Sequence, residues 1–448
     1  MGTLRPADLP RRQTGPVASQ WAPDMTILLI IAILFALLLI GVPVAFALGG
    51  LGLGMLILGG FSPLMAPQAI LSTLDGFILL AVPLFLLMSN ILLKGGVGRD
   101  LFAAVQAWVG HWPGGLAVAT ILSCALFAAI SGSSVATAAT IGTVAIPEMI
   151  SRGYDRRFVY GLLAAGGTLG ILIPPSIPMI VYGFVTEQSV IALFLGGIGP
   201  GILLVVLFIL FAMLHARFSD AYQPMAKASM SERISATIRA VPSLALALLV
   251  VVGLYSGAFT PTEAAAVGFA AALAITIFWL RTLTWAAFWE AVRDSAVTTT
   301  AILLIIAGAK VFGKAIALYR IPQDISAFIS ANIDGPVAFI IVISIVLLLM
   351  GLFFETLSMI LIMTPVLLPA AMRLGFDPIW FGIYMVIMVE CALITPPVGL
   401  NLYVIQSVAR ATLGDVARGV MPFLILMLLT VGLLYLWPDL ALYIPFKW

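Results

Sequence analysis

The chain has 448 residues, of which 62% are apolar and only 9% are charged, and its formal net charge at pH 7 is +2. Soluble globular proteins carry about 25% charged residues, so this composition excludes that class and indicates a polytopic membrane protein. The lysines and arginines form no basic stripe for nucleic acid. Cys124 and Cys391 stand in apolar runs, without the spacing of a disulfide framework or a metal site.

The first residues and the apolar blocks that follow define the membrane segments. Residues 1–24 are polar and rich in proline and arginine, which predicts a disordered leader. The apolar run from Thr26 continues toward Gly60 and predicts a retained anchor rather than a cleaved signal. Blocks long enough to cross a bilayer, at about 20 residues each, predict roughly ten or eleven segments. They include 26–60, 70–93, 113–130, 158–187, 189–215, 242–281, 295–319, 336–353, 378–408 and 419–437.

The least apolar stretch of the chain body, 216–240, contains three arginines and one lysine. It divides the chain into a first repeat, 25–215, and a second repeat, 241–448. Because basic connections remain in the cytoplasm, we predict that 216–240 is a cytoplasmic connecting segment. Two amphipathic stretches, 98–111 and 322–333, are expected to lie along the membrane interface.

The two repeats share their helix-breaking residues at a constant offset of 222 positions. Pro147, Gly153, Asp155, Pro174, Pro175, Gly197 and Pro200 recur as Pro369, Gly375, Asp377, Pro396, Pro397, Gly419 and Pro422. The connection 151–157 carries three arginines, whereas the matching 373–379 carries one. By the positive-inside rule the two connections lie on opposite sides of the membrane, which predicts inverted repeats.

Each repeat also contains a run in which small and hydroxylated residues precede a proline. These runs, 131–151 and 354–375, begin Ser131-Gly132-Ser133-Ser134 and Phe354-Glu355-Thr356-Leu357-Ser358. We predict two re-entrant hairpins, because non-helical backbone at membrane depth is tolerated only where protein or a wet cavity surrounds it. Inversion requires an odd number of crossings between them, so 242–281 is expected to count as one net crossing.

Two of the apolar blocks, 158–187 and 378–408, are predicted to be broken helices, because each contains a Pro-Pro pair. Proline has no N–H, so the carbonyls four residues earlier lose their donors. Those carbonyls belong to Gly170 and Ile171 before Pro174-Pro175, and to Ala392 and Leu393 before Pro396-Pro397. Buried carbonyls without partners are costly, and sodium prefers such hard oxygen ligands. The half-helix after each break presents free N–H groups that suit an anionic substrate.

Hydroxyl and amide side chains accompany the breaks and the hairpins. They are Thr168, Ser176, Thr395 and Asn401 beside the breaks, and Ser131, Ser133, Ser134, Thr356 and Ser358 in the hairpin openings. If each opening meets its neighbouring break, every repeat builds one oxygen-rich cage and the substrate lies between the two cages. The predicted substrate-binding residues are Ser133, Ser176, Thr356 and Asn401.

Ionisable residues inside membrane segments are functional candidates. The carboxylates near or within apolar blocks are Asp75, Glu148, Glu187, Glu263, Glu355 and Glu390. Glu355, at a hairpin opening, and Glu390, within a broken helix, are the strongest candidates. Glu263 instead belongs to Thr260-Pro261-Thr262-Glu263, which is typical of a helix start.

One glycine- and lysine-containing segment, Gly308 to Ala315, has the spacing of a phosphate-binding loop. Ala315 stands where that loop needs a hydroxyl, and the segment lies within an apolar span. Nucleotide binding is therefore not predicted.

Five strings, in this order, resemble the large membrane subunit (DctM-like) of tripartite ATP-independent periplasmic (TRAP) transporters over nearly the whole chain from Met25. They are Gly41-Val42-Pro43-Val44-Ala45-Phe46, Ser131-Gly132-Ser133-Ser134-Val135-Ala136-Thr137, Gly170-Ile171-Leu172-Ile173-Pro174-Pro175-Ser176, Phe259-Thr260-Pro261-Thr262-Glu263-Ala264 and Thr395-Pro396-Pro397-Val398-Gly399-Leu400-Asn401. The resemblance implies an all-α, elevator-type transporter of the bacterial inner membrane with the inverted-repeat fold of the ion-transporter superfamily.

The same resemblance implies sodium-driven import of a small carboxylate, such as a C4-dicarboxylate, a keto acid or a sialic acid. Sodium is the coupling ion, and no other cofactor or covalent chemistry is expected. The partners implied are a small four-helix membrane subunit on a separate chain and a periplasmic substrate-binding protein. The implied sodium sites are the Ser131–Ser134 opening with the Gly170–Pro175 break, and the Glu355–Ser358 opening with the Ala392–Pro397 break.

Three other functions remain open from the sequence. A stand-alone sodium/dicarboxylate symporter would share the architecture but need no binding protein. An intramembrane serine protease could use Ser133, although it would need a base at the same depth, and His111 and His215 both sit at span edges. A passive channel would not accumulate substrate against a gradient.

Overall fold

The computed structural model describes residues 23–218, 225–333, 335–397 and 399–447. Residues 1–22, which make up nearly all of the predicted leader, and Val398 in the second break lie outside this set. Within the described ranges the chain forms helices and no β-strand. The predicted all-α class is therefore confirmed.

The helices of the first repeat follow one another with short connections. They are α1 (Pro23–Leu39), α2 (Val44–Leu58), α3 (Met65–Leu74), the 3-10 helix η1 (Phe77–Leu80), α4 (Ala81–Lys94), α5 (Val97–Val109), α6 (Gly115–Ser131), α7 (Ser134–Ser151), α8 (Arg156–Leu172), α9 (Ile177–Thr186) and α10 (Val190–Arg217).

The second repeat has a matching series, in which one long helix replaces α3 and α4. It consists of α11 (Met230–Tyr255), α12 (Pro261–Ala274), the π-helix η2 (Ile275–Trp279), α13 (Trp285–Leu318), α14 (Ile321–Asn332), α15 (Gly335–Met350), α16 (Thr356–Arg373), α17 (Pro378–Leu393), α18 (Leu400–Ala409), α19 (Leu413–Leu436) and α20 (Asp439–Lys447).

The repeated aspartates explain why two helices begin where they do. The Asp155 carboxylate accepts a hydrogen bond from the Phe158 N–H at 2.9 Å at the start of α8. The Asp377 carboxylate accepts one from the Ile379 N–H at 2.8 Å at the start of α17. Both therefore satisfy donors that the first helical turn leaves free, and the offset in the sequence corresponds to a shared structural role.

Eight helices in the described part of the chain are long and apolar enough to cross a membrane, or nine if α8 and α9, bent by 43°, form one span. This number is lower than the ten or eleven segments predicted, although it includes α7 and α16, which lie in the predicted hairpins. One reason is that blocks 113–130 and 336–353 form α6 and α15, which belong to the shorter apolar helices.

The hairpins differ from their predicted bounds. Residues 131–151 contain only one helix, α7, and its partner is α6, which packs against it across Gly132 and Ser133. Likewise 354–375 contains only α16, which follows α15 across a short break. The residues predicted to open each hairpin therefore mark its tip rather than its entrance. The first reversal uses the small residues Gly132 and Ser133, whereas the second, from Gly351 to Glu355, also contains Leu352, Phe353 and Phe354.

The prediction of one net crossing for 242–281 is wrong, because Ser256 to Thr260 separates two span-length segments, α11 and α12 with η2. A second difference offsets this one, since α15 is a hairpin arm and no longer a span. The segments between the two hairpins are α8 with α9, α10, α11, α12 and α13, so their number remains odd.

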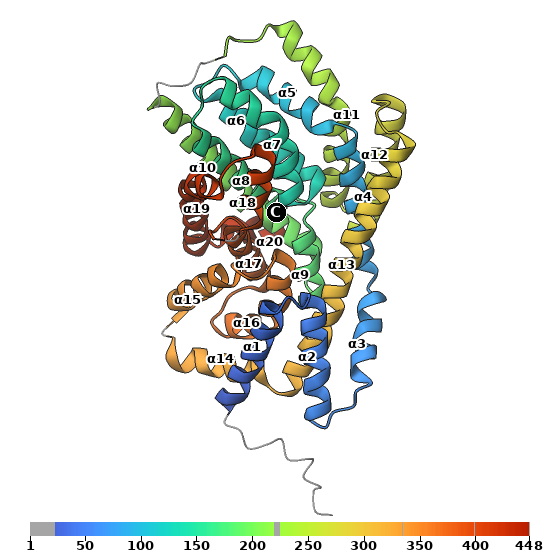
Figure 1. Cartoon of the computed structure of the whole chain (residues 1–448), viewed down its shortest axis with the longest axis vertical. Coiled ribbons are helices and arrows are strands. Elements are labelled where there is room, and N and C mark those ends of the chain that lie inside the picture. The colour runs from blue at the N-terminus through green and yellow to red at the C-terminus, as the bar shows by residue number, and fades with distance from the viewer. Residues whose placement is uncertain (1–22, 219–224, 334, 398, 448) are drawn as a thin grey trace, which may run out of the picture.

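Figure 1 shows α5, α6 and α7 toward one end of the molecule, and α14, α15 and α16 toward the other. This arrangement is expected for inverted repeats. Helices α5 and α14 coincide with the two segments predicted to lie along the interface. Along one side of the molecule, α13 packs against α2, α3 and α4, and α4 packs against α12.

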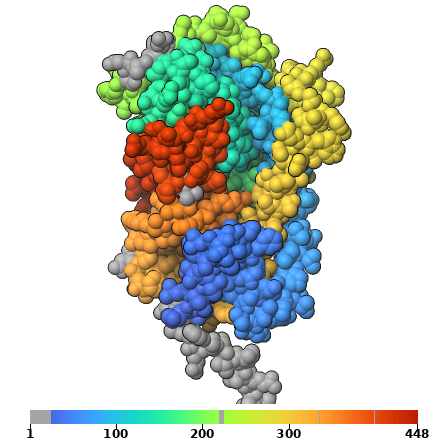
Figure 2. All heavy atoms as spheres, viewed as in Figure 1, coloured from blue at the N-terminus to red at the C-terminus, as the bar shows by residue number. Residues whose placement is uncertain are grey.

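The two repeats are not separate bodies. Helix α7 of the first repeat packs against α18 of the second, and α16 of the second packs against α9 of the first. On the surface in Figure 2, the red C-terminal segment lies against teal first-half segments, and orange second-half segments lie against the blue N-terminal helices. The boundaries at 215 and 241 therefore divide the sequence and not the fold.

Glycines allow α2 and α13 to approach each other closely. A Cβ on Gly52 would lie 2.8 Å from the backbone nitrogen of Phe312, and one on Gly308 would overlap the carbonyl oxygen of Ala45. Small residues at such contacts are typical of helix pairs in membranes, where close packing drives association. The two helices thus form a tightly packed pair beside the hairpins.

Replacing Gly308 with alanine is expected to destabilise the protein by about 1–3 kcal/mol, the usual cost of overpacking. Thermal unfolding of the purified chain in detergent measures this effect. The control is Gly313→Ala on the same helix, since a Cβ there meets nothing within 4 Å. Equal melting temperatures for the two variants would show that the α2–α13 contact is looser than described.

Candidate functional site

The tip of the first hairpin touches the first helix break through backbone atoms. Gly132, between α6 and α7, has a left-handed φ of +61°, and a Cβ on it would lie 2.6 Å from the carbonyl oxygen of Pro175. A Cβ on Gly170 would lie 2.8 Å from the carbonyl oxygen of Ser133. The predicted meeting of hairpin and break is therefore confirmed in the first repeat.

The second hairpin meets the second break in the same manner. Gly351 follows α15, and a Cβ on it would overlap the side chain of Ala392 and lie 3.0 Å from its Cα. Glu355 is the residue before α16, and its carboxylate accepts a hydrogen bond from the Ser358 hydroxyl at 3.2 Å. The carboxylate thus lies at the first turn of the hairpin arm.

Asn401, in the first turn of α18, joins the two repeats. Its side-chain amide donates to the Ser134 hydroxyl in α7 and, at 3.3 Å, to the carbonyl of Ala164 in α8. All three groups are buried, and Glu390 of α17 is fully buried beside Ser134. The second broken helix is therefore anchored to the first hairpin.

A cavity of about 140 Å³ lies where the two tips and the two breaks converge. Helices α4 and α13 close it from the other side through Leu86, Thr298 and Ile302. The predicted site residues that line it are Gly132, Ser133, Ser134, Ile171, Glu355, Thr356 and Leu393. Those that lie on the same tips, breaks and adjoining turns without lining it are Ser131, Gly170, Pro174, Pro175, Ser176, Ser358, Ala392, Thr395, Pro396, Pro397 and Asn401.

Two predicted hydroxyls cap helices. The Ser133 hydroxyl accepts from the Ala136 N–H at 3.3 Å, and the Ser176 hydroxyl accepts from the Met179 N–H at 3.4 Å. These bonds satisfy the first turns of α7 and α9. A ligand that used those N–H groups would have to share them with the serine oxygens.

Thr137 is part of the first tip, although it was not among the predicted site residues. Its hydroxyl donates to the Ser133 carbonyl at 2.8 Å and lies 2.8 Å from the Ser131 hydroxyl. Its position four residues after Ser133 could have indicated this contact, since helix neighbours at that spacing share a face. Thr298, on α13, was also missed.

The prediction that Ala392 has a carbonyl without a donor is wrong. The chain turns tightly after α17, so the Thr395 N–H donates to that carbonyl at 3.2 Å, and the Thr395 hydroxyl donates to the Cys391 carbonyl at 2.6 Å. The first break differs, because Ile173 leaves α8 in an extended conformation. The two breaks, although both Pro-Pro bonds are cis, therefore present their oxygens differently.

Most of the other carboxylates have structural roles. Glu148 pairs with Arg152 at 2.9 Å. Glu263 and Thr260 form reciprocal side chain to backbone bonds at the start of α12, which confirms the predicted helix start. Asp75 and Glu187 are exposed at helix ends. Only Glu355 and Glu390 remain close to the central cavity.

The histidines are placed away from the first tip. The His215 ring stacks on Phe158 with 4.2 Å between the ring centroids, near the end of α10. His111 lies in the connection between α5 and α6. Among the described residues, no histidine lines the cavity that contains Ser133.

Comparison with known proteins identifies the family. The family described as "Tripartite ATP-independent periplasmic transporter, DctM component" matches residues 31–440. The chain is 40% identical over 373 residues to the C4-dicarboxylate TRAP transporter large permease protein DctM of Pseudomonas aeruginosa, a match that covers 83% of this chain and 87% of that protein. It is 34% identical to the sialic acid TRAP transporter large permease protein SiaM of Vibrio cholerae, over 91% of this chain and 96% of that one.

A solved structure with the same fold is the Alcanivorax borkumensis YdaH transporter, whose topology is described as unusual. The TM-score is 0.54 over 94% of this chain and 98% of that one, at 14% sequence identity. At this identity the likeness concerns the fold alone. On the strength of the family match and its close relatives, the chain belongs to the DctM component family of TRAP transporters and is a large permease subunit of the bacterial inner membrane.

Proposed function

We propose that the chain imports a small organic anion and couples this import to the entry of sodium. The observation that carries the proposal is the convergence of two hairpin tips and two helix breaks on one central cavity. Broken helices and hairpins leave backbone carbonyls and N–H groups without helical partners. Such sites bind a cation and an anion side by side in secondary transporters.

The proposed sodium ligands are oxygens at the two tip-and-break contacts. In the first repeat they come from Ser131, Gly132, Ser133 and Ser134 with Gly170, Ile171, Pro174 and Pro175. In the second they come from Glu355, Thr356 and Ser358 with Ala392, Leu393, Thr395, Pro396 and Pro397. Carbonyl and hydroxyl oxygens suit a hard cation, and a carbonyl that accepts one hydrogen bond, such as that of Ala392, retains a second lone pair.

The proposed substrate carries a carboxylate. Ser133, Ser176, Thr356 and Asn401 stand at or beside the first turns of α7, α9, α16 and α18. A helix N-terminus offers N–H donors and a partial positive charge to an anion. Several relatives are described as transporters of C4-dicarboxylates, sialic acid and 2,3-diketo-L-gulonate, which are carboxylates. Another is described as a transporter of isethionate, which is a sulfonate and also an organic anion.

Transport is proposed to move one part of the protein against the other. The hairpins and broken helices would move as a unit, and the packed helices α2, α3, α4, α12 and α13 would remain fixed. The cavity lies at the boundary between these parts, since α4 and α13 line one of its sides. We also propose a separate small four-helix membrane subunit and a periplasmic binding protein as partners, in keeping with the tripartite family.

The experiment is uptake into proteoliposomes that contain the chain and a candidate small subunit. A panel of labelled succinate, a keto acid and sialic acid is presented with and without periplasmic binding proteins from the same genome. An inward sodium gradient is expected to drive accumulation of one compound above its external concentration, and an equal potassium gradient is not.

Each other outcome identifies another function. Accumulation by the chain with no binding protein would overturn the tripartite assignment and indicate a stand-alone symporter. Equilibration without accumulation would indicate a channel. In a separate assay with peptides in detergent, cleavage by the unmodified chain that Ser133→Ala abolishes would indicate a protease instead.

A further inference from the structure

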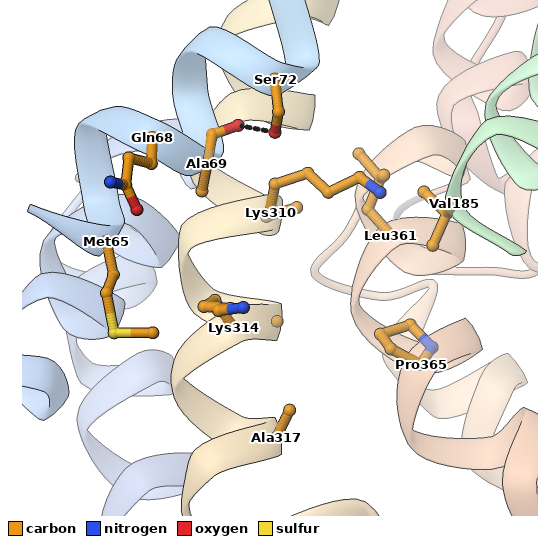
Figure 3. A pocket seen from close by; sticks show the side chains of 12 residues that line it. Met65, Gln68, Ala69, Ser72, Val185, Lys310, Lys314, Ala317, Leu361 and Pro365 are labelled. Atoms are coloured by element: carbon orange, nitrogen blue, oxygen red, sulfur yellow. Dashed lines mark hydrogen bonds between the residues drawn. The ribbon is translucent and has the colours of Figure 1, made fainter. Parts of the chain in front are cut away.

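A second cavity, of about 490 Å³, lies between α3 and α13 on one side and α9 and α16 on the other. Figure 3 shows two lysines, Lys310 and Lys314, one turn apart on α13, with the Lys310 side chain extended toward Leu361 and Val185. This cavity contains the lysines of the segment whose spacing resembles a phosphate-binding loop. Neither lysine is part of the site described above.

Three helices connect this cavity to the central one. Helix α13 contributes Thr298 and Ile302 to the central cavity, and Lys310 and Lys314 to the second. The steps from Ile302 to Lys310, and from Leu357 to Pro365 on α16, are each about 12 Å along the helix axis. Helix α9 likewise lines both cavities. The two cavities thus lie along the same three helices, about two helical turns apart.

The charge of the second cavity is positive, since its lining includes two lysines and no carboxylate. Lys310 is half-buried, and its ammonium lies 4.6 Å from the centre of the Phe184 ring. Glu187, exposed at the end of α9, is the carboxylate that interacts with it through space. Neither lysine forms an ion pair with a described residue, whereas Lys94 lies 2.9 Å from Glu290.

The opposite end of the molecule provides a comparison. A cavity of about 470 Å³ there is lined by Ala139 and Thr143 of α7, the counterparts of Leu361 and Pro365 at the offset of 222. Its charged lining residues are Arg99 and Asp100, one of each sign. Of these two cavities, only the second therefore has an excess of positively charged lining residues.

We propose that the second cavity is an entry vestibule that binds the carboxylate of the substrate through Lys310 and Lys314 before it reaches the central cavity. The vestibule lies toward the end of the molecule that holds α14 and α16, away from the connecting segment predicted to be cytoplasmic. It therefore opens to the side from which a periplasmic protein delivers substrate. This inference rests on the proposed function for the direction of transport and for the substrate class.

The first test does not depend on transport. Ala317, which is exposed and lines the vestibule, is replaced with cysteine in the full chain reconstituted with its small subunit. The native cysteines are both buried. The modification ratio is the rate of reaction with an anionic thiosulfonate divided by the rate with a cationic one. This ratio is expected to fall at least about 5-fold in the Lys310→Gln/Lys314→Gln background, because two nearby positive charges are removed. Lys227→Gln, on the exposed connecting segment, is the matched control.

The second test uses the uptake assay with the compound that the panel identifies. The double glutamine variant is expected to raise KM at least about 5-fold, with kcat and the sodium dependence unchanged, and the double arginine variant should restore KM. An unchanged modification ratio would overturn the anion site. A changed ratio with an unchanged KM would overturn its role in entry. Absence of uptake by the unmodified chain would contradict the proposed function, and the modification ratio would still decide whether the vestibule attracts anions.

Discussion

Replacing Gly132 with alanine is expected to reduce sodium-driven uptake by about 100-fold, the effect that a displacement of 1 Å can have on a positioned site. The left-handed φ of +61° costs a side chain about 1–2 kcal/mol. In addition, the new Cβ would lie 2.6 Å from the Pro175 carbonyl oxygen. The tip must then move away from the break and would separate the proposed sodium ligands. Uptake per molecule of protein in the liposome measures the effect.

The strain and the collision can be separated with a second glycine. Gly257, between α11 and α12, has a similar φ of +71°, but a Cβ there meets nothing within 4 Å. Gly257→Ala is therefore expected to leave uptake within about twofold of the unmodified chain, because it introduces the strain without the collision. Normal uptake by Gly132→Ala would show that the tip and the break need not touch, and the proposed cage in the first repeat would fail.

Replacing Asn401 with alanine is expected to reduce uptake at least tenfold and to lower the stability by about 1–3 kcal/mol. The substitution removes the donor to Ser134 and to the Ala164 carbonyl, both buried, so two polar groups lose a partner. It also removes a proposed substrate ligand at the start of α18. Uptake and the melting temperature in detergent are measured on the same preparation.

Asn332 is the matched control, because its side-chain amide donates only to the Phe328 carbonyl of its own helix, at 2.9 Å on an exposed face. Asn332→Ala is expected to change uptake by less than about twofold and the free energy of unfolding by less than about 0.5 kcal/mol. If Asn401→Ala behaves like this control, Asn401 neither joins the repeats nor binds the substrate. If only the stability falls, its role is structural alone.

The sequence located the breaks because these depend on local chemistry, and for the same reason it identified the residues of the hairpin tips, although it placed them at the hairpin entrances. Two adjacent prolines cannot continue a helix, and a tight reversal such as Ser131-Gly132-Ser133 requires small residues. The first arm of each hairpin, α6 or α15, was wrongly predicted to cross the bilayer. An apolar helix such as α6 has the same composition whether it crosses the bilayer or turns back within it. Length alone could not separate these cases, and the same ambiguity led to the single crossing expected of 242–281.

Contacts between the repeats could not be predicted from one repeat at a time. The bonds from Asn401 to Ser134 and Ala164 join residues far apart in the sequence, and nothing local indicates that α18 lies against α7. The prediction for the Ala392 carbonyl was wrong for a related reason. The rule that proline removes a donor is correct, but it does not say whether the following chain turns back, as Thr395 does, or extends, as Ile173 does.

The interlocking of α7 with α18 and of α16 with α9 has a consequence for how the two halves depend on each other. Lipid can cover the apolar faces of either half made alone, but it cannot replace the polar partners that the other half provides, such as the Asn401 amide for the Ser134 hydroxyl. Two fragments separated between α10 and α11 and produced together are therefore expected to associate in one bilayer.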